Sequence, residues 1–261
     1  MTTDATTNRQ IAAQSSSFVG VVRDKIDLIV TPTFFVILAA AVGAVWVYSD
    51  FDSTTARILS WDGLLPNITD HLVMTFWSTV LVVAIAIPLG IFITRPNFKK
   101  YAGPILTFAN SGQAIPAFGL LVLFAGFFGR GQRTAIIAFT VFALLPVLRN
   151  TMVGLQQVDQ SVIEAGRGMG LSKRQALFDI ELPLAVPVIL AGVRTALVIN
   201  VGMATLAFLI GGGGLGEPIG AGLQLNRPTA VFIAGGMVAA LALLIDFLAA
   251  LAERYLKPKG I

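Results

Sequence analysis

The 261-residue chain contains no cysteine, a single histidine and no phosphate-binding loop of the form G-x-x-x-x-G-K-[ST]. Without cysteine there is no disulfide framework, thiolate nucleophile or zinc–cysteine site. Without the phosphate-binding loop the chain itself is not expected to hydrolyse ATP. One histidine does not make a metal site, so a helix-capping or interfacial role is expected for His71. The sequence therefore predicts no catalytic residue, no metal and no cofactor in this chain.

Charged residues are also scarce, at 12% of the chain against about 25% in soluble domains, whereas 56% of the residues are hydrophobic and the mean hydropathy is +0.82. Several apolar runs reach the roughly 20 residues that a membrane-spanning helix needs. The short alternating segments of a membrane barrel are missing. The sequence predicts an all-α integral membrane protein with about six transmembrane helices, at residues 32–50, 71–94, 102–128, 134–151, 183–210 and 228–252.

Lysine and arginine gather before the first of these spans, between spans two and three, between spans four and five, and after span six. Positively charged loops stay in the cytoplasm, so both termini are expected there. The net charge of +4 fits loops that face anionic lipid, and no nucleic-acid partner is expected. The predicted division is a cytoplasmic tail (1–31), a peripheral first span (32–50), an external loop (51–70), a core (71–252) and a second cytoplasmic tail (253–261).

The longest polar interval between spans predicts two short helices joined by a tight turn. Ser161-x-x-Glu164 has the form of a capping box, in which each side chain bonds a backbone N–H at the start of a helix. Gly170 suits the left-handed residue that ends such a helix. Ser172-x-x-Gln175 repeats the box and opens a second helix, which leads into span five.

The same interval carries the pattern E-A-G, three residues, G, nine residues, I-x-L-P. It resembles the E-A-A signature of the permease subunits of bacterial binding-protein-dependent ABC importers, with Gly166 in place of the second alanine. The resemblance implies a type I importer permease core in the inner membrane, with a cytoplasmic coupling helix in a loop at about 156–182 that docks onto an ATPase. The residues expected to couple to that ATPase are Glu164, Ala165, Gly166, Gly170, Ile180, Leu182 and Pro183.

The resemblance also implies partners that this chain lacks. A second permease subunit, identical or related, would complete the translocation path. Two cytoplasmic ATPase subunits would bind ATP and Mg²⁺. Few residues follow span six, so the extracytoplasmic substrate-binding protein is expected to be a separate chain.

Shorter motifs are similar to the permeases of glycine betaine, carnitine and choline importers, which import compatible solutes for osmoprotection. At Ala117 close relatives more often have serine. An amino acid or another small solute remains an alternative. An ion-coupled carrier is a weaker one, because neither inverted repeats nor clear intramembrane carboxylates are found. The motifs lie at residues 110–116, 144–151, 168–170, 181–185 and 212–216.

Polar residues inside spans are costly and tend to be functional. Asn110, Ser111 and Gln113 precede Pro116 and are expected to break span three and line the pathway, as are Asn200 and Thr205 in span five. Interhelical hydrogen bonding is the alternative for each. Arg194 and Asp246 lie at depths where they could pair.

A glycine-rich segment follows span five on the predicted outer side. It formally matches a dinucleotide-binding fingerprint, but it follows a membrane span and lacks the acidic residue expected about twenty positions later. A flexible outer loop that closes the translocation gate or meets the binding protein is predicted instead. Its residues are Gly212, Gly213, Gly214 and Gly216.

Overall fold

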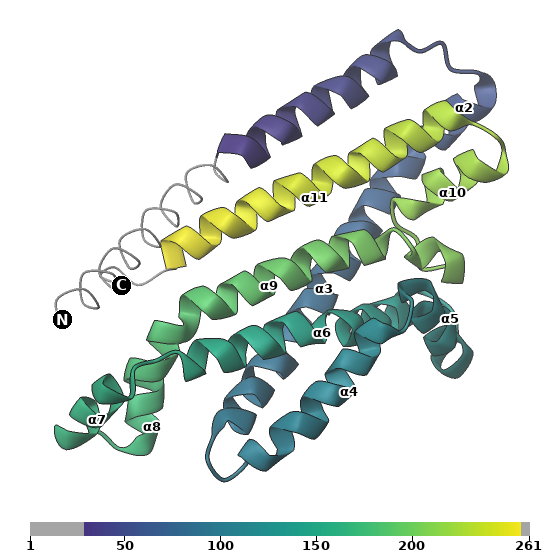
Figure 1. Cartoon of the computed structure of the whole chain (residues 1–261). Coiled ribbons are helices and arrows are strands. Elements are labelled where there is room, and N and C mark those ends of the chain that lie inside the picture. Colours follow the sequence, from purple (N-terminus) through teal and green to yellow (C-terminus); the bar gives the residue numbers. More distant parts are fainter. Residues whose placement is uncertain (1–28, 257–261) are drawn as a thin grey trace, which may run out of the picture.

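A computed structural model describes residues 29–256, and every regular element in that range is helical (Figure 1). The predicted all-α class is confirmed. The helices are an unlabelled first helix at Ile29–Tyr48, then α2 (Ser53–Ile58), α3 (Trp61–Thr94), η1 (Lys99–Tyr101), α4 (Ala102–Ala114), α5 (Ala117–Phe128), α6 (Gln132–Gln156), α7 (Gln160–Gly168), α8 (Lys173–Ala176), the π-helix η2 (Leu177–Glu181), α9 (Leu182–Ala204), η3 (Ala207–Ile210), α10 (Gly216–Gln224) and α11 (Pro228–Leu256).

Five of these helices are long and apolar enough to cross a membrane, and a sixth crossing results if the bent pair of α4 and α5 counts as one span. The two halves of that pair meet at 101° around Ile115 and Pro116. Proline disfavours helix in the residue before it, so the chain turns where the sequence predicts a break. The predicted set of about six spans is confirmed in this form.

Residues 51–70 form less of a loop than the sequence predicts. Only the first half lies outside the long helices, and it contains the short helix α2. The second half, from Trp61 onward, is the start of α3, with Ser60 at the N-cap position and Asp62 in the first turn. An acidic residue there is stabilised by the helix dipole. The second half of this segment is therefore helix instead of loop, and the external location of residues 51–70 stays a prediction.

Three helices form the centre of the molecule. α3, α6 and α9 pack along one another, with α4, α5 and α11 around them (Figure 1). Small residues allow the close approach, as at Gly192 of α9, where a Cβ atom would lie 2.7 Å from the Cβ of Asn150 and 3.0 Å from the Pro146 carbonyl oxygen. Helix association in membranes depends on such contacts, because apolar burial supplies little difference between lipid and protein.

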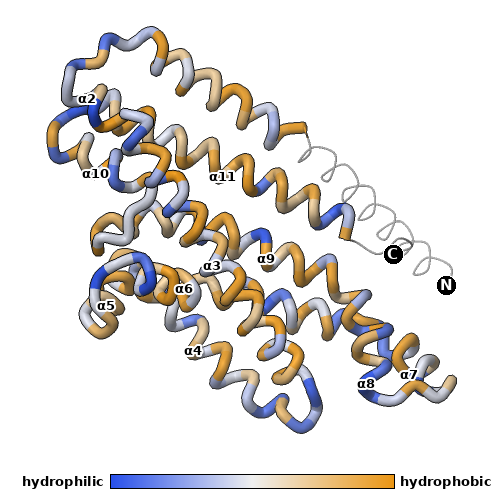
Figure 2. Tube along the Cα trace, turned by 180° about the vertical axis from the view of Figure 1, so that it is seen from behind, coloured by the Kyte–Doolittle hydropathy of each residue, from blue (hydrophilic) through white to orange (hydrophobic). Residues whose placement is uncertain are grey.

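The first helix stands at the edge of the bundle, alongside α11 in both views (Figures 1 and 2). It packs there through Val42, whose side chain touches the backbone of Gly236. Only 6% of its most apolar window is buried inside the protein. The predicted tails lie mostly in residues 1–28 and 257–261, outside the described residues. α11 continues to Leu256, past the predicted boundary at 252.

The bundle has two ends, named here for what they carry. The knob is the segment from Gln160 to Glu181, which contains α7, α8 and η2, and it projects from one end. We call this the knob end. The opposite end carries α2, η3 and α10 and is called the α10 end (Figure 1).

Candidate functional site

The first helix of the knob is capped two residues earlier than the sequence predicts. Asp159 occupies the N-cap of α7, and its Oδ1 accepts a hydrogen bond from the Ser161 N–H at 2.8 Å. This bond holds the pKa of Asp159 below its usual value of 3.8. Ser161 lies inside the first turn and does not cap, so the predicted box of Ser161 and Glu164 is wrong. Glu164 is exposed.

The turn between the two knob helices has the predicted chemistry. Gly170 has a left-handed φ of 98°, and its N–H donates to the Arg167 carbonyl at 3.0 Å, while the Leu171 N–H donates to the Gly166 carbonyl at 3.2 Å. These two bonds form a Schellman motif, in which glycine is favoured because it has no Cβ. The second box is confirmed: Ser172 and Gln175 each accept a backbone hydrogen bond from the other.

Two residues of the pattern E-A-G … G … I-x-L-P, Gly166 and Ile180, touch each other across the knob. A Cβ atom on Gly166 would overlap the Cδ1 atom of Ile180, and the Leu171 Cδ1 would lie 3.2 Å away. The close contact presses α7 against η2 and accounts for glycine where alanine is typical. It also leaves Val162 (44% exposed) and Met169 (81% exposed) on the free surface of the knob.

The second half of the knob is continuous with a membrane span. Residues from Lys173 to Ala204 form one helical run, which passes through the π-turn of η2 and the Leu182–Pro183 step. Pro183 has no N–H to donate to the preceding turn, and the wider π-turn of η2 directly precedes it. A displacement of the knob is therefore also a displacement of α9.

An ion pair that the sequence did not predict joins the knob to α3. Arg95 Nη2 lies 2.6 Å from Glu181 Oε2, and Arg95 Nη1 donates to Glu181 Oε1 at 3.1 Å. The carboxylate is nearly buried, with its side chain 10% exposed. The sequence places both residues at the same end of the bundle, but it offers many cations there and does not select Arg95.

At the break between α4 and α5, Gln113 has a structural partner. Its Nε2 donates to the Phe142 carbonyl of α6 at 3.3 Å. Phe142 lies four residues before Pro146, which has no N–H, so the helix itself cannot satisfy that carbonyl. Ser111 donates within its own helix to Thr107 at 2.9 Å, and Asn110 is exposed.

The two predicted pathway residues of α9 lie differently. Asn200 is fully buried between α3 and α6. In the orientation that satisfies both ends of its amide, it donates to the Phe139 carbonyl (3.3 Å) and accepts from the Thr79 hydroxyl (3.0 Å). This is the interhelical bonding considered as the alternative. The buried Thr205 hydroxyl has no hydrogen-bond partner among the described residues.

The glycine-rich segment at the α10 end is packed, in contrast to the flexible loop that the sequence predicts. Gly213 and Gly214 take left-handed φ values of 77° and 91°. Their lack of side chains matters, because a Cβ on Gly213 would lie about 2.5 Å from a carboxylate oxygen of Asp70 and one on Gly214 would lie 3.1 Å from the Met74 methyl group. Gly216 meets the Thr205 carbonyl in the same way.

His71 fixes this glycine segment to two helices. Its Nδ1 accepts from the Leu215 N–H at 3.4 Å, and its Nε2 donates to the Val201 carbonyl at 3.0 Å. The expected capping role is wrong, because α3 begins at Trp61 and His71 therefore lies almost three turns inside the helix. Beside it, Asp70 accepts a hydrogen bond from the Gln132 amide at 3.1 Å.

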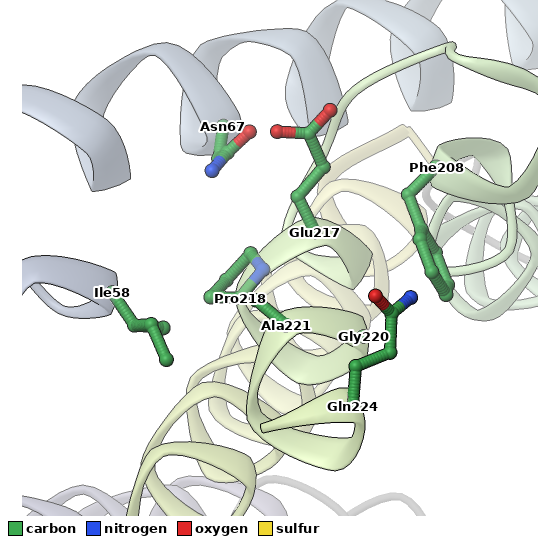
Figure 3. A pocket seen from close by; sticks show the side chains of 8 residues that line it. All are labelled: Ile58, Asn67, Phe208, Glu217, Pro218, Gly220, Ala221 and Gln224. Atoms are coloured by element: carbon green, nitrogen blue, oxygen red, sulfur yellow. The ribbon is translucent and has the colours of Figure 1, made fainter. Parts of the chain in front are cut away.

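A hollow of about 380 Å³ opens beside the glycine segment (Figure 3). Glu217 and Asn67 lie near each other at one side of it, and the Phe208 ring stands beside Gln224 at another. None of the eight described residues that line it is cationic. Its residues are Ile58, Asn67, Phe208, Glu217, Pro218, Gly220, Ala221 and Gln224.

Arg194 and Asp246 form the pair that their depths allow. Arg194 Nε lies 2.5 Å from Asp246 Oδ1, and Nη2 lies 2.7 Å from Oδ2. The two-point contact joins α9 to α11 and neutralises two charges within membrane-spanning helices, where single charges are costly. Among the described residues, no group of three or more His, Asp or Glu side chains could hold a metal ion.

Comparison with known proteins defines the class of this arrangement. Residues 86–258 match the family model described as the binding-protein-dependent transport system inner membrane component. The chain belongs to this family, and it is a multi-pass inner-membrane permease subunit of an importer that works with an ATPase and a substrate-binding protein. An ion-coupled carrier is thereby excluded.

Individual relatives are similar over most of their length. The glycine betaine/carnitine/choline transport system permease protein OpuCB of Bacillus subtilis (strain 168) is 40% identical over 200 residues, which cover 76% of this chain and 90% of that protein. The choline transport system permease protein OpuBB of the same organism is 41% identical with the same coverage. Among solved structures, an inward-facing MetNI methionine ABC transporter matches with a TM-score of 0.67 and 26% identity, over 75% of this chain and 97% of that one.

Proposed function

We propose that this chain is the permease of an ATP-driven importer for quaternary-amine compatible solutes of the glycine betaine, carnitine and choline type. The observation that carries the solute class is the 40–41% identity to permeases named for such solutes, over at least three quarters of the chain. The structural likeness to a methionine transporter, at 26% identity, supports an amino-acid solute less well.

The knob end is proposed to face the cytoplasm, with both termini on that side. Two features support this orientation. Lys99 and Lys100 follow the knob-end terminus of α3, and Lys173 and Arg174 lie on the knob itself. Positive residues are retained in the cytoplasm. α11 also ends toward the knob end (Figure 1).

The knob is proposed to be the surface that docks onto the partner ATPase. It is rigid, since caps, a Schellman turn and the contact of Gly166 with Ile180 determine its shape. Its exposed side chains include the apolar Val162 and Met169 and the carboxylate of Glu164. This chain is proposed to have no enzymatic activity, and ATP and Mg²⁺ to bind the partner ATPase dimer.

The translocation path is proposed to run past the bend between α4 and α5. Asn110 and Ser111 lie on the α4 side of that bend, and Gln113 keeps it against α6. A second permease subunit would face these residues and complete the path. The packed glycine segment from Gly212 to Gly216 is proposed as the outer gate, next to the site where a separate binding protein delivers the solute.

Uptake of radiolabelled glycine betaine tests the proposal in cells that express the complete transporter. Glu164→Lys alters the docking surface and Gly170→Val strains the left-handed turn, so each is expected to abolish uptake while the permease stays in the membrane. Asp50→Lys, the same charge reversal at an exposed residue outside the knob, is the matched control and is expected to transport normally. Normal uptake in both knob variants would refute the docking role, and no uptake in wild type would refute the solute.

A further inference from the structure

The ion pair between Arg95 and Glu181 connects two elements that the peptide chain separates by 86 positions. Arg95 is the C-cap residue of α3 and Glu181 is the last residue of the π-helix η2. The guanidinium is held from three sides, since it also donates to the Ile91 carbonyl and to the Thr94 hydroxyl, each at 3.3 Å. A two-point contact between planar groups fixes direction as well as distance.

Glu181 stands at the position where the knob meets the membrane domain. Its neighbour Ile180 touches Gly166 of α7. Two successive residues of η2 therefore contact two different helices, Ile180 contacting α7 and Glu181 contacting α3. η2 is a π-turn, a rare wider turn that frequently marks functional sites. The apolar contact of Ile180 has no preferred direction, whereas the ion pair is directional.

The other end of α3 reaches the glycine segment. With 34 residues, α3 is about 50 Å long. Almost three turns inside its opposite end, it is bonded through His71 to Leu215 and to Val201 of α9. Asp70, one residue earlier, accepts from Gln132 at the start of α6. One helix therefore contacts the knob at its C-terminal end and the proposed gate ten residues inside its N-terminal end.

We propose that Arg95 and Glu181 are positioning residues of the transport cycle, and that their ion pair transmits displacement of the knob through α3 to the glycine segment. The inference rests on the proposed function, because it assumes that the knob is displaced by an ATPase. Neither residue needs to touch the solute or ATP. A partly buried ion pair is weak evidence for added stability, and its geometry suits the transfer of motion better.

The test compares solute import with ATP hydrolysis in proteoliposomes that contain the permease, its ATPase and its binding protein. Arg95→Gln and Glu181→Gln each keep the shape of the side chain and remove one charge. Each is expected to lower the number of solute molecules imported per ATP by about fivefold or more, which is within the usual range of allosteric coupling. The double variant is expected to be no worse than either single variant, because both act through one connection.

A purely structural pair predicts another result. Solute import and ATP hydrolysis would then fall together, with the number of solute molecules imported per ATP unchanged, and this outcome would overturn the proposal. A double variant whose loss of import per ATP equals the product of the two single losses would also overturn it. Asp246→Asn is the matched control, since it breaks a comparable ion pair between α9 and α11. It is expected to lower the yield of protein and to leave the number of solute molecules imported per ATP as in wild type.

A second measurement needs no solute. The chain has no cysteine, so spin labels can be attached at Thr69→Cys on α3 and Phe127→Cys on α5, both exposed positions. Trapping the ATPase with ATP and vanadate is expected to change the distance between the labels, and Glu181→Gln is expected to abolish the change. An equal change in both backgrounds would overturn the proposal. Failure of wild type to import glycine betaine would refute only the proposed solute.

Discussion

Replacing Gln113 with leucine removes the hydrogen-bond donor to the Phe142 carbonyl, which has no partner within its own helix, α6. The Gln113 amide lies 3.3 Å from the Phe142 oxygen of α6, and Pro146 has no N–H to offer that oxygen. Leucine has a similar size and cannot donate, so the Phe142 carbonyl loses its partner while the packing volume changes little. The end of α4 then also loses a fixed point on α6.

The expected cost follows from the membrane setting. Interhelical hydrogen bonds in membrane proteins average about 0.6 kcal/mol and reach about 1.7 kcal/mol, and a buried carbonyl without a partner costs about 1–3 kcal/mol. Because 3.3 Å is a long hydrogen bond, we expect Gln113→Leu to lower the free energy of unfolding by about 0.6–1.5 kcal/mol. For a chain of this size the corresponding decrease in Tm is about 1–6 °C.

Pro146→Ala supplies the control for this prediction. It restores an N–H at position 146, which can bond the Phe142 carbonyl within α6. In that background Gln113→Leu is expected to cost little, so the two changes are strongly non-additive. Thermal unfolding of the purified protein in detergent, followed by tryptophan fluorescence, measures all four variants; thiol-reactive dyes cannot be used, since the chain lacks cysteine. Equal costs in both backgrounds, within about 0.3 kcal/mol, would refute the reasoning.

Three further predictions concern the knob and the ion pair of α9. The methyl group added by Gly166→Ala overlaps only the flexible end of Ile180, so this variant is expected to keep most of the solute uptake, whereas Gly166→Leu should abolish uptake. Adding Ile180→Val, which shortens the overlapping side chain, should make the Gly166→Ala variant fully active. Uptake by the Gly166→Leu variant would contradict the close packing. Asp159 has a lowered pKa, so its cap stabilises α7 above pH 3.8 and this contribution is lost as the pH falls through the folded pKa. Asp159→Asn should keep the cap and remove its pH dependence. Hydrogen exchange of the α7 amides at pH 6 and pH 3, compared between wild type and Asp159→Asn, measures this. The same pH response in the two proteins would argue against a role of the Asp159 charge in the cap. Asp246→Asn removes the Asp246 carboxylate from Arg194. Because the pair is partly exposed, the free energy of unfolding should fall by about 1–3 kcal/mol, less than the roughly 3–5 kcal/mol of a fully buried pair. Unchanged thermal stability would show that the pair contributes nothing.

Much of the architecture could be predicted because local rules act over short distances. Long apolar runs give membrane helices wherever they occur, and proline disfavours helix in the residue before it, as at Ile115. The turn at Gly170 and the box of Ser172 and Gln175 depend on residues at most five positions apart. The box at Ser161 was wrong for a related reason, since a competing acceptor, Asp159, lies only two positions before it.

The site is different, because its decisive contacts join residues far apart in the chain. The sequence by itself determined the membrane class, the number of spans, the recurrent pattern of the knob and the presence of polar residues at depth. Only the tertiary structure decided that Gln113 bonds the Phe142 carbonyl of α6, which Pro146 leaves without a helical partner, and that Arg95 pairs with Glu181. It also decided that His71 fastens the glycine segment. A hydrogen bond or ion pair acts over a few ångströms, and only folding brings the partners within that range.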